Sequence, residues 1–318
     1  MRTGLMIGSD REHPRSERLS TLIEDVQAAE DEGFASVWIP QVPGYLDAMT
    51  VVTALGQATE RLELGTSVVP IQSRHPIALA QQALTTQLAC KGRFTLGLGP
   101  SHHWLIEEQW GLSYEKPALL VRDYLEVLRA AFEGPGSVEV ENESFRVHSP
   151  MNVIDPEPMS VLISALAPMM LRLAGEQTSG TILWMADEKA ISEHVIPRIT
   201  KAATGAGRPR PRIVAGVPVA LCRRGSEEAA RSTAKEVLGH ADFSPNYARL
   251  LEQGDAKDID DVMAVGDEAS IASRLRGYRD AGVTDLMARI VPLGESTEER
   301  LRSRREARQY VATLISEL

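Results

Sequence analysis

Residues 62–99 read LELGTSVVPIQSRHPIALAQQALTTQLACKGRFTLGLG, and this stretch decides the fold class. Leu62–Val69 is rich in apolar and β-branched residues, which predicts a strand. Pro76 suits the first turn of a helix that runs to about Ala89. Phe94–Leu98 is another short apolar run and predicts the next strand. A strand, a helix and a strand in this order are typical of a βα unit in a parallel sheet.

The same alternation extends outward over the whole chain. Short apolar runs separated by helical patterns predict eight strands, over Thr3–Gly8, Ser36–Ile39, Leu62–Val69, Phe94–Leu98, Val161–Ser164, Thr181–Met185, Arg212–Leu221 and Asp285–Val291. Eight strands in βα order favour a closed barrel over an open doubly wound sheet. We therefore expect a single domain over residues 1–318, with the α/β fold of a (β/α)₈ TIM barrel.

One segment breaks this rhythm. Gly134–Pro158 is rich in Pro, Gly and Glu, and within it Val138–Val147 alternates between apolar and polar residues as a hairpin does. We interpret it as an insertion after strand four of the barrel. Together with the loops Gly8–Arg18 and Pro40–Leu46, the insertion is expected to build the substrate pocket.

Composition narrows the class of protein. The 318 residues are 43% hydrophobic and 25% charged, which allows a large core, and the net charge of −10 argues against a nucleic-acid partner. Cys90 and Cys222 are far apart, and no Cys/His cluster has zinc spacing, so we expect no metal site and a reducing, cytoplasmic setting. The sequence contains no run of about 18 apolar residues, so we expect no membrane-spanning helix.

The active site of such a barrel lies at the C-terminal ends of its strands, in the βα loops. The richest of these loops is GLGPSHHW, residues 97–104, directly after the fourth predicted strand. Its glycines let the backbone approach a ligand closely, and Ser101 offers a hydroxyl. His102 can carry a proton near neutral pH. The alternative is a tight turn with a surface pair of histidines.

Three further segments end at the same rim. The small residues around Thr66–Val68 leave room for a ring, although Gly65 could instead only ease a barrel corner. Ala167–Met169 open a helix whose first N–H groups can bind a phosphate, or they are a plain helix start. Gln41 follows the second strand and points to the same rim.

Other charged segments give weaker evidence for a functional site. Asp10, Arg11, Glu12 and His13 could do acid–base work or hold a metal, but a solvated loop is the better interpretation. Arg74 could meet an acidic ligand tail or belong to a solvated loop. The chain contains no phosphate-binding P-loop, no GxSxG elbow and no HExxH pair, which argues against a kinase-like enzyme, an esterase and a zinc peptidase.

Several blocks occur in a familiar order: GFASVW at 33–38, LELGTSV at 62–68, RHP at 74–76, GRFTLGLG at 92–99, VGD at 265–267 and YRDAGVTD at 278–285. Together they resemble the luciferase-like monooxygenase superfamily over nearly the whole chain. The run GLGPSH at 97–102 is most similar to the members that depend on coenzyme F420, a deazaflavin. The resemblance implies a (β/α)₈ barrel with an insertion after strand four, as the periodicity does.

The resemblance also implies which residues hold the cofactor. In F420-dependent members a non-proline cis peptide in strand three supports the deazaflavin ring, and its match here is Ser67–Val68. The loop after strand four binds the cofactor backbone and the loop after strand five binds its phosphate. With Gln41 and Thr66, the expected cofactor contacts are then Ser67, Val68, Gly99, Pro100, Ser101, His102, His103, Ala167, Pro168 and Met169.

This chain departs from the family pattern at the positions of the residues that could donate a proton. Several members carry Asp-His after strand two, where Gln41 and Val42 stand here, and an acidic residue after strand four, about where His102 stands. His102, with His103 as a candidate helper, is therefore the candidate catalytic proton donor. The resemblance implies an F420-dependent oxidoreductase that transfers hydride between the deazaflavin and a small-molecule substrate, and, because the family commonly forms dimers through outer helices, a homodimer. An FMN-dependent monooxygenase and a non-catalytic cofactor-binding barrel are the alternatives.

Overall fold

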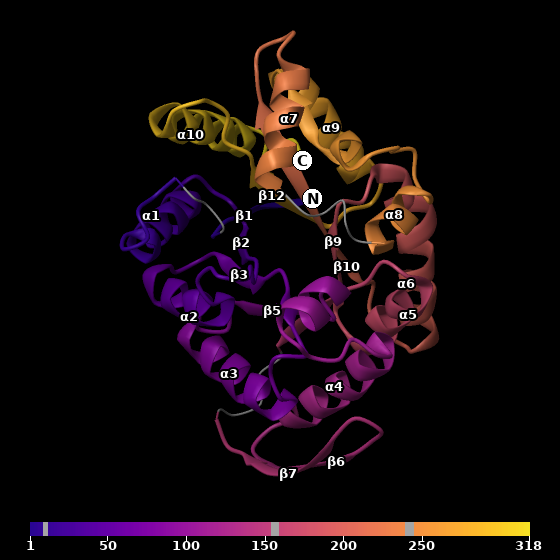
Figure 1. The fold of residues 1–318 in the computed structure, drawn as a ribbon. Coiled ribbons are helices and arrows are strands. Elements are labelled where there is room, and N and C mark those ends of the chain that lie inside the picture. The colour runs from indigo at the N-terminus through magenta and orange to yellow at the C-terminus, as the bar shows by residue number, and fades with distance from the viewer. Residues whose placement is uncertain (9–11, 154–158, 239–244) are drawn as a thin grey trace.

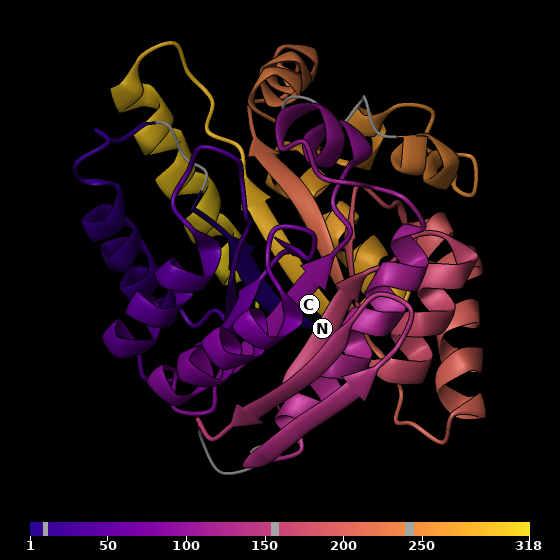
Figure 2. The same cartoon turned by 60° about the horizontal axis from the view of Figure 1, so that its bottom comes forward.

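The computed structural model describes residues 1–8, 12–153, 159–238 and 245–318. Its centre is a closed barrel of eight parallel strands (Figures 1 and 2), namely β1 (Arg2–Met6), β2 (Ser36–Ile39), β3 (Glu63–Thr66), β5 (Phe94–Gly99), β8 (Ser160–Ser164), β9 (Gly180–Trp184), β10 (Arg212–Leu221) and β12 (Asp285–Ile290). The ring closes because β10 pairs with both β9 and β12, and β12 pairs with β1. The predicted (β/α)₈ TIM barrel is confirmed.

Helices surround the barrel on all sides in Figure 1. Those of the repeating βα units are α1 (Arg18–Asp31), α2 (Ala48–Ala58), α3 (Pro76–Ala89), α4 (Pro117–Phe132), α5 (Pro168–Gln177), α6 (Ile196–Gly205), α9 (Glu268–Asp280) and α10 (Thr297–Thr313). Local sequence explains where several begin. The Asp47 carboxylate accepts the Thr50 N–H at the start of α2, and Pro76 and Pro168 open α3 and α5.

The connections between barrel strands and helices contain additional helices, helical turns and one short strand. A π-helical turn, η1 (Trp104–Gln109), follows β5, and another, η2 (Ala190–Val195), precedes α6. The long connection after β10 contains α7 (Glu227–Leu238), α8 (Pro245–Leu251), the 3₁₀ turn η4 (Ile259–Val262) and a short strand, β11 (Ala264–Gly266), that pairs with the end of β10. The sequence did not predict β11, which has three residues.

The insertion contains the expected hairpin, β6 (Gly136–Glu141) paired antiparallel with β7 (Arg146–Met151). Its turn packs on helix α4, where the Ser144 N–H and hydroxyl donate to the Asp123 carboxylate and the Phe145 ring lies against Tyr124. Figure 1 shows the hairpin outside the ring of helices. The expectation that this hairpin walls the substrate pocket is therefore wrong. The last residues of the insertion, 154–158, lie outside the described residues.

A second difference concerns strand three. The continuous strand expected over Leu62–Val69 is divided into β3 and β4 (Val69–Pro70), and the peptide bond between Ser67 and Val68 in the gap is cis. β3 and β4 both pair with β5, so the break leaves the chain in its place in the barrel. The cis bond stands where the family resemblance implied it.

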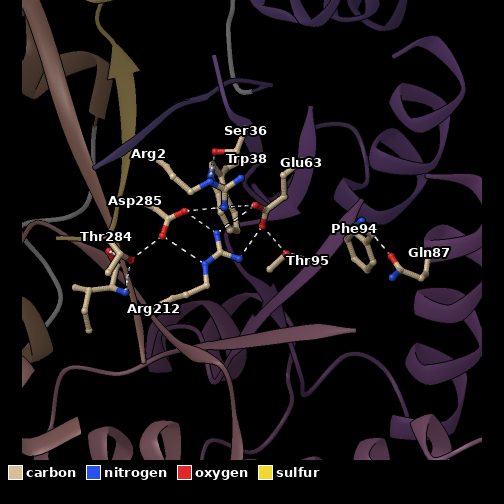
Figure 3. Close-up of polar contacts among 11 residues, drawn as sticks. Arg2, Ser36, Trp38, Glu63, Gln87, Phe94, Thr95, Arg212, Thr284 and Asp285 are labelled. Atoms are coloured by element: carbon tan, nitrogen blue, oxygen red, sulfur yellow. Dashed lines mark hydrogen bonds and ion pairs between the residues drawn. The ribbon is translucent and has the colours of Figure 1, made fainter. Parts of the chain in front are cut away.

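The N-terminal end of the barrel is closed by a network of charges (Figure 3). The Arg212 guanidinium lies 2.8 Å from Glu63 Oε1 and 2.6 Å from Asp285 Oδ1. Arg2 contacts the same two carboxylates, and the Thr95 hydroxyl donates to Glu63 Oε1 at 2.6 Å. Two largely buried carboxylates are thus balanced by two guanidiniums, that of the half-buried Arg212 and that of Arg2, which is 46% exposed.

Above this network the barrel interior is apolar. Met6, Trp38, Leu162, Ile182, Val214 and Met287 form one buried cluster, with Val68 and Trp184 packed against it. The two tryptophans fit because glycines stand opposite them. A Cβ atom on Gly65 would lie 2.4 Å from the Trp38 ring, and one on Gly216 would lie 2.5 Å from the Trp184 ring. The interior is therefore a packed core, and function is confined to its C-terminal rim.

Candidate active site at the C-terminal rim

Three of the predicted cofactor segments meet at one side of the rim. Pro70 is in register with Gly99, and Leu98 is in register with Ile163, so the ends of β4, β5 and β8 lie side by side. The Ser67 N–H donates to the Ile39 carbonyl at 2.9 Å, which brings the end of β2 alongside. Residues far apart in the sequence are therefore neighbours here.

The hydroxyl groups of Thr66 and Ser67, next to the cis bond, differ in whether they have a partner within the described part of the chain. Thr66 is fully buried, and its hydroxyl donates to the Gly97 carbonyl at 2.8 Å and accepts the Gly97 N–H at 2.9 Å. Because that hydroxyl is used within the barrel, Thr66 supports the site rather than contacting a ligand through it. The Ser67 Oγ is buried and has no hydrogen-bond partner in the described part of the chain. A bound group could supply that partner.

The loop after β5 is held by backbone contacts. A Cβ atom on Gly99 would lie 2.0 Å from Ser164 Oγ, so only glycine allows this close approach to β8. Ser101 has a φ of 60°, in the left-handed region. Its carbonyl accepts the Tyr114 hydroxyl at 2.9 Å, and the Pro100 carbonyl accepts the Gln72 side-chain amide at 2.8 Å. The loop is thus fixed in shape by neighbours on both sides.

The structure separates the two histidines of this loop. His102 is half-buried, stacked on Trp104 with ring centroids 5.8 Å apart and lying 5.7 Å from the Tyr247 ring. Burial, and then the neighbouring His103, lower the pKa of His102 from its usual value. His103 is exposed and its ring contacts Tyr114. His102 is therefore a neutral imidazole at pH 7 in a partly dry setting, and His103 faces solvent.

Tyr247 is a site residue that the sequence reasoning missed. It belongs to α8, whose following segment is held to the rim by the buried Asp187 carboxylate, which accepts the N–H groups of Asp255 and Ala256 at 2.7 and 2.8 Å. Asn246 on the same helix hydrogen-bonds to the Tyr114 side chain. No local pattern marks Tyr247, because its contact with His102 spans more than 140 residues of sequence.

The start of α5 is open to a ligand. Ala167 is the N-cap residue in extended conformation, without a side-chain hydrogen bond to the first turn, and Pro168 follows it. Met169 is 66% exposed. The first N–H groups of a helix have no partner within the helix and are able to bind an anion.

The remaining rim residues are engaged in other contacts or outside the described residues. The Gln41 side-chain oxygen accepts the Ala48 N–H at 2.9 Å, which ties it to the start of α2 and leaves its amide hydrogens for other partners. Arg74 forms an ion pair with Asp47. An acidic ligand tail would therefore have to compete with the Asp47 carboxylate for the Arg74 guanidinium. Asp10 and Arg11 lie outside the described residues. Within the residues that the structure describes, no group of three or more His, Cys, Asp or Glu side chains is placed to hold a metal ion.

The comparisons with known proteins agree with this barrel. The luciferase-like monooxygenase family matches residues 1–285, and the chain belongs to that family. No helix in the described ranges is both long and apolar enough to cross a membrane.

Relatives within this fold use more than one cofactor. A 5,10-methylenetetrahydromethanopterin reductase from Archaeoglobus fulgidus is 25% identical over 291 residues, covering 83% of this chain and 87% of its own. The coenzyme F420-dependent tetrahydromethanopterin reductase of Methanopyrus kandleri superposes with a TM-score of 0.75 at 20% identity, covering 98% and 97% of the two chains. A type II Baeyer-Villiger monooxygenase from Pseudomonas putida, in complex with FMN, has a TM-score of 0.74 at 15% identity, covering 100% and 98%.

Proposed function

We propose that this protein is an F420-dependent oxidoreductase that exchanges hydride with a small organic substrate. The observation that carries the proposal is the meeting, at one rim, of the 67–68 segment, the loop after β5 and the open start of α5. These segments match the ring, backbone and phosphate positions that the F420-dependent resemblance implies. The reductases from Archaeoglobus fulgidus and Methanopyrus kandleri support the same class of reaction.

The residues present fit such a cofactor. The buried Ser67 hydroxyl offers a hydrogen bond to a ring edge, and Gly99 lets the backbone of the β5 loop come close. Gly99, Pro100 and Ser101 would hold the chain that leads from the ring, and the start of α5 at Ala167–Met169 would hold its phosphate. Bound F420 would supply the hydride acceptor or donor.

His102 would accept or return the substrate proton that moves together with the hydride. When a carbinol C–H is lost as hydride, the hydroxyl proton must leave as well, and a carbonyl forms. A neutral imidazole can accept that proton, and the lowered pKa of His102 keeps it neutral near pH 7. In the opposite direction the same group would return the proton to the carbonyl oxygen.

An FMN-dependent monooxygenase is the second candidate, because the Pseudomonas putida neighbour holds FMN in the same fold. Purified protein titrated separately with F420 and with FMN, followed by cofactor fluorescence, decides between them. We expect quenching with F420 at micromolar concentration and weaker or no quenching with FMN. Tight FMN binding without F420 binding would make the monooxygenase the better assignment. Binding of F420 without turnover on any alcohol or carbonyl compound would favour the non-catalytic barrel.

Replacing His102 with glutamine is expected to slow turnover by roughly 10²–10⁴-fold, because the proton then lacks its acceptor. Wild-type activity should fall as the pH drops through the lowered pKa of His102, below the ordinary value of 6.5, and this acid limb should disappear in the variant. The measurement is the rate of F420 reduction against pH, using an alcohol that supports turnover. His148→Gln, at an exposed histidine of the outer hairpin, is the matched control and should keep both rate and profile. Equal rates in the two variants would remove His102 from the mechanism.

A further inference from the structure

A buried histidine of the next βα unit holds the loop that leads into α5. His194, on the π-helical turn η2, is only 7% exposed. Its Nε2 atom lies 2.9 Å from the carbonyl oxygen of Leu166, the residue directly before the Ala167–Met169 segment. A carbonyl oxygen only accepts hydrogen bonds, so Nε2 carries the ring proton and donates it. This hydrogen bond joins η2 to the loop in front of the expected phosphate position.

The hydrogen bond fixes the direction of the peptide group between Leu166 and Ala167. This peptide bond is trans, and in a planar trans peptide the C=O and N–H groups point in opposite directions. Because the Leu166 carbonyl points to His194, the Ala167 N–H points away from η2. The same N–H is the first of the backbone donors at the start of α5. A rotated peptide would present an acceptor where this donor stands.

The loop has no polar side chain of its own that could keep this orientation. Residues 166–168 have apolar side chains, and Ala167 makes no side-chain hydrogen bond as the N-cap residue of α5. Directly before them, the Ala165 N–H donates to the Thr181 hydroxyl of β9 at 3.2 Å. These two polar anchors come from the following βα unit, Thr181 from its strand and His194 from its helical turn.

The element that carries His194 is itself fixed against α5. A Cβ atom on Gly175 of α5 would lie 2.4 Å from the Ile199 carbonyl oxygen of α6, so these two helices, side by side in Figure 1, are in close contact. Arg198 of α6 donates from Nη1 to the His194 carbonyl at 2.8 Å. The His194 side chain therefore holds the Leu166 carbonyl at a constant place relative to α5.

The remaining ring nitrogen of His194 makes no comparable contact. Nδ1 is buried and has no hydrogen-bond partner in the described part of the chain. A buried polar atom without a partner is unfavourable, and an apolar side chain would avoid that cost. The polar contribution of this imidazole is therefore its hydrogen bond to Leu166.

We propose that His194 is a positioning residue for the phosphate of the cofactor. It holds the peptide between Leu166 and Ala167 with the carbonyl toward η2 and the N–H on the opposite side, available to the phosphate. This inference rests on the proposed function, because the start of α5 is taken as the phosphate position. Without the imidazole donor, the peptide is free to turn its carbonyl oxygen, which repels a phosphate, toward the ligand.

The test compares F420 with the deazaflavin riboside that lacks the phosphate, by fluorescence titration. We expect the wild type to bind F420 more tightly than the riboside. His194→Leu should weaken F420 binding by about 3–10-fold, the effect of one hydrogen bond, and leave riboside binding within about 2-fold. His194→Gln, whose amide N–H can stand in for Nε2, should restore most of the F420 affinity.

Thr178→Val, at the other end of α5, is the matched control. The buried Thr178 hydroxyl donates to the Ala174 and Gly180 carbonyls at 2.8 and 3.0 Å, so its loss destabilises α5 without touching the loop in front of it. We expect a lower midpoint of thermal unfolding and an unchanged ratio of F420 affinity to riboside affinity. If His194→Leu shows this same pattern, its role is structural only and the proposal is overturned.

Competition by inorganic phosphate examines the same position without the riboside. Phosphate should displace F420 from the wild type, and His194→Leu should need about 3–10-fold more of it. Equal phosphate competition in both proteins, or no competition in the wild type, would overturn the proposal. If His194→Leu does not fold by circular dichroism, His194→Asn, whose shorter amide ends where Nδ1 stands, must lose F420 affinity while His194→Gln keeps it. A wild type that binds no F420 would refute the proposed function itself.

Discussion

Replacing Arg212 with methionine is expected to lower the free energy of unfolding by about 3–5 kcal/mol, because Glu63 and Asp285 would stay buried without their main cation. Domains of ordinary stability have about 5–15 kcal/mol in total, so the variant should unfold at much lower denaturant concentration. Urea unfolding followed by circular dichroism measures the difference. Lys91→Met, which removes an exposed ion pair with Glu60, is the control and should change stability by less than about 1 kcal/mol.

The pH dependence of this variant tests the mechanism. Burial opposes ionisation of Glu63, but hydrogen bonds and charge from Arg212, with smaller help from Thr95 and Arg2, outweigh burial and hold the pKa of Glu63 below its usual 4.5. A carboxyl with a lowered folded-state pKa contributes stability above its unfolded-state pKa and loses it as the pH falls through the folded-state value. The gap between wild type and Arg212→Met should therefore stay nearly constant from pH 7 down to the usual pKa of 4.5 and narrow as the pH falls further, through the lowered pKa of Glu63. A constant gap would show that lost packing, and not unpaired charge, destabilises the variant.

Periodicity was sufficient to predict the barrel because each βα unit is largely a local pattern. Val37, Leu64 and Leu96 are buried members of short apolar runs, and Pro76 marks a helix start that the structure retains. The position of the hairpin was not predictable in this way. Its alternation indicates two strands, but the contacts of Phe145 with Tyr124 and of Ser144 with Asp123 decide where it packs.

The site was predictable where a motif stood at a strand end, as in the loop after β5. Tyr247 could not be found, because only the folding of the connection after β10 brings it to His102. Thr66 was expected to contact the cofactor, but its hydrogen bonds to Gly97 make it a support.

Gly97 lies against Thr66 and shares two hydrogen bonds with it. Gly97→Ala is therefore the second variant for which we expect a large effect. A Cβ atom at residue 97 would lie 1.9 Å from the Thr66 carbonyl oxygen and 2.6 Å from Ile182 Cδ1. The isoleucine methyl can move, but the carbonyl belongs to the backbone of β3, so β3 and β5 must separate. We expect a loss of about 3 kcal/mol or more in the free energy of unfolding, at the upper end of the cost of overpacking.

The same displacement should reach the cofactor site, since Thr66 directly precedes Ser67 and Gly97 lies two residues before Gly99. Any Gly97→Ala protein that folds should therefore bind F420 at least about 10-fold more weakly, a change that corresponds to about 1.4 kcal/mol. Gly205→Ala, at the end of α6 with no atom within 4 Å of the added carbon, is the matched control and should be neutral or slightly stabilising. Wild-type stability and F420 affinity in Gly97→Ala would mean that β3 and β5 can separate without disturbing the rim, and would leave the 67–68 segment without a fixed link to the β5 loop.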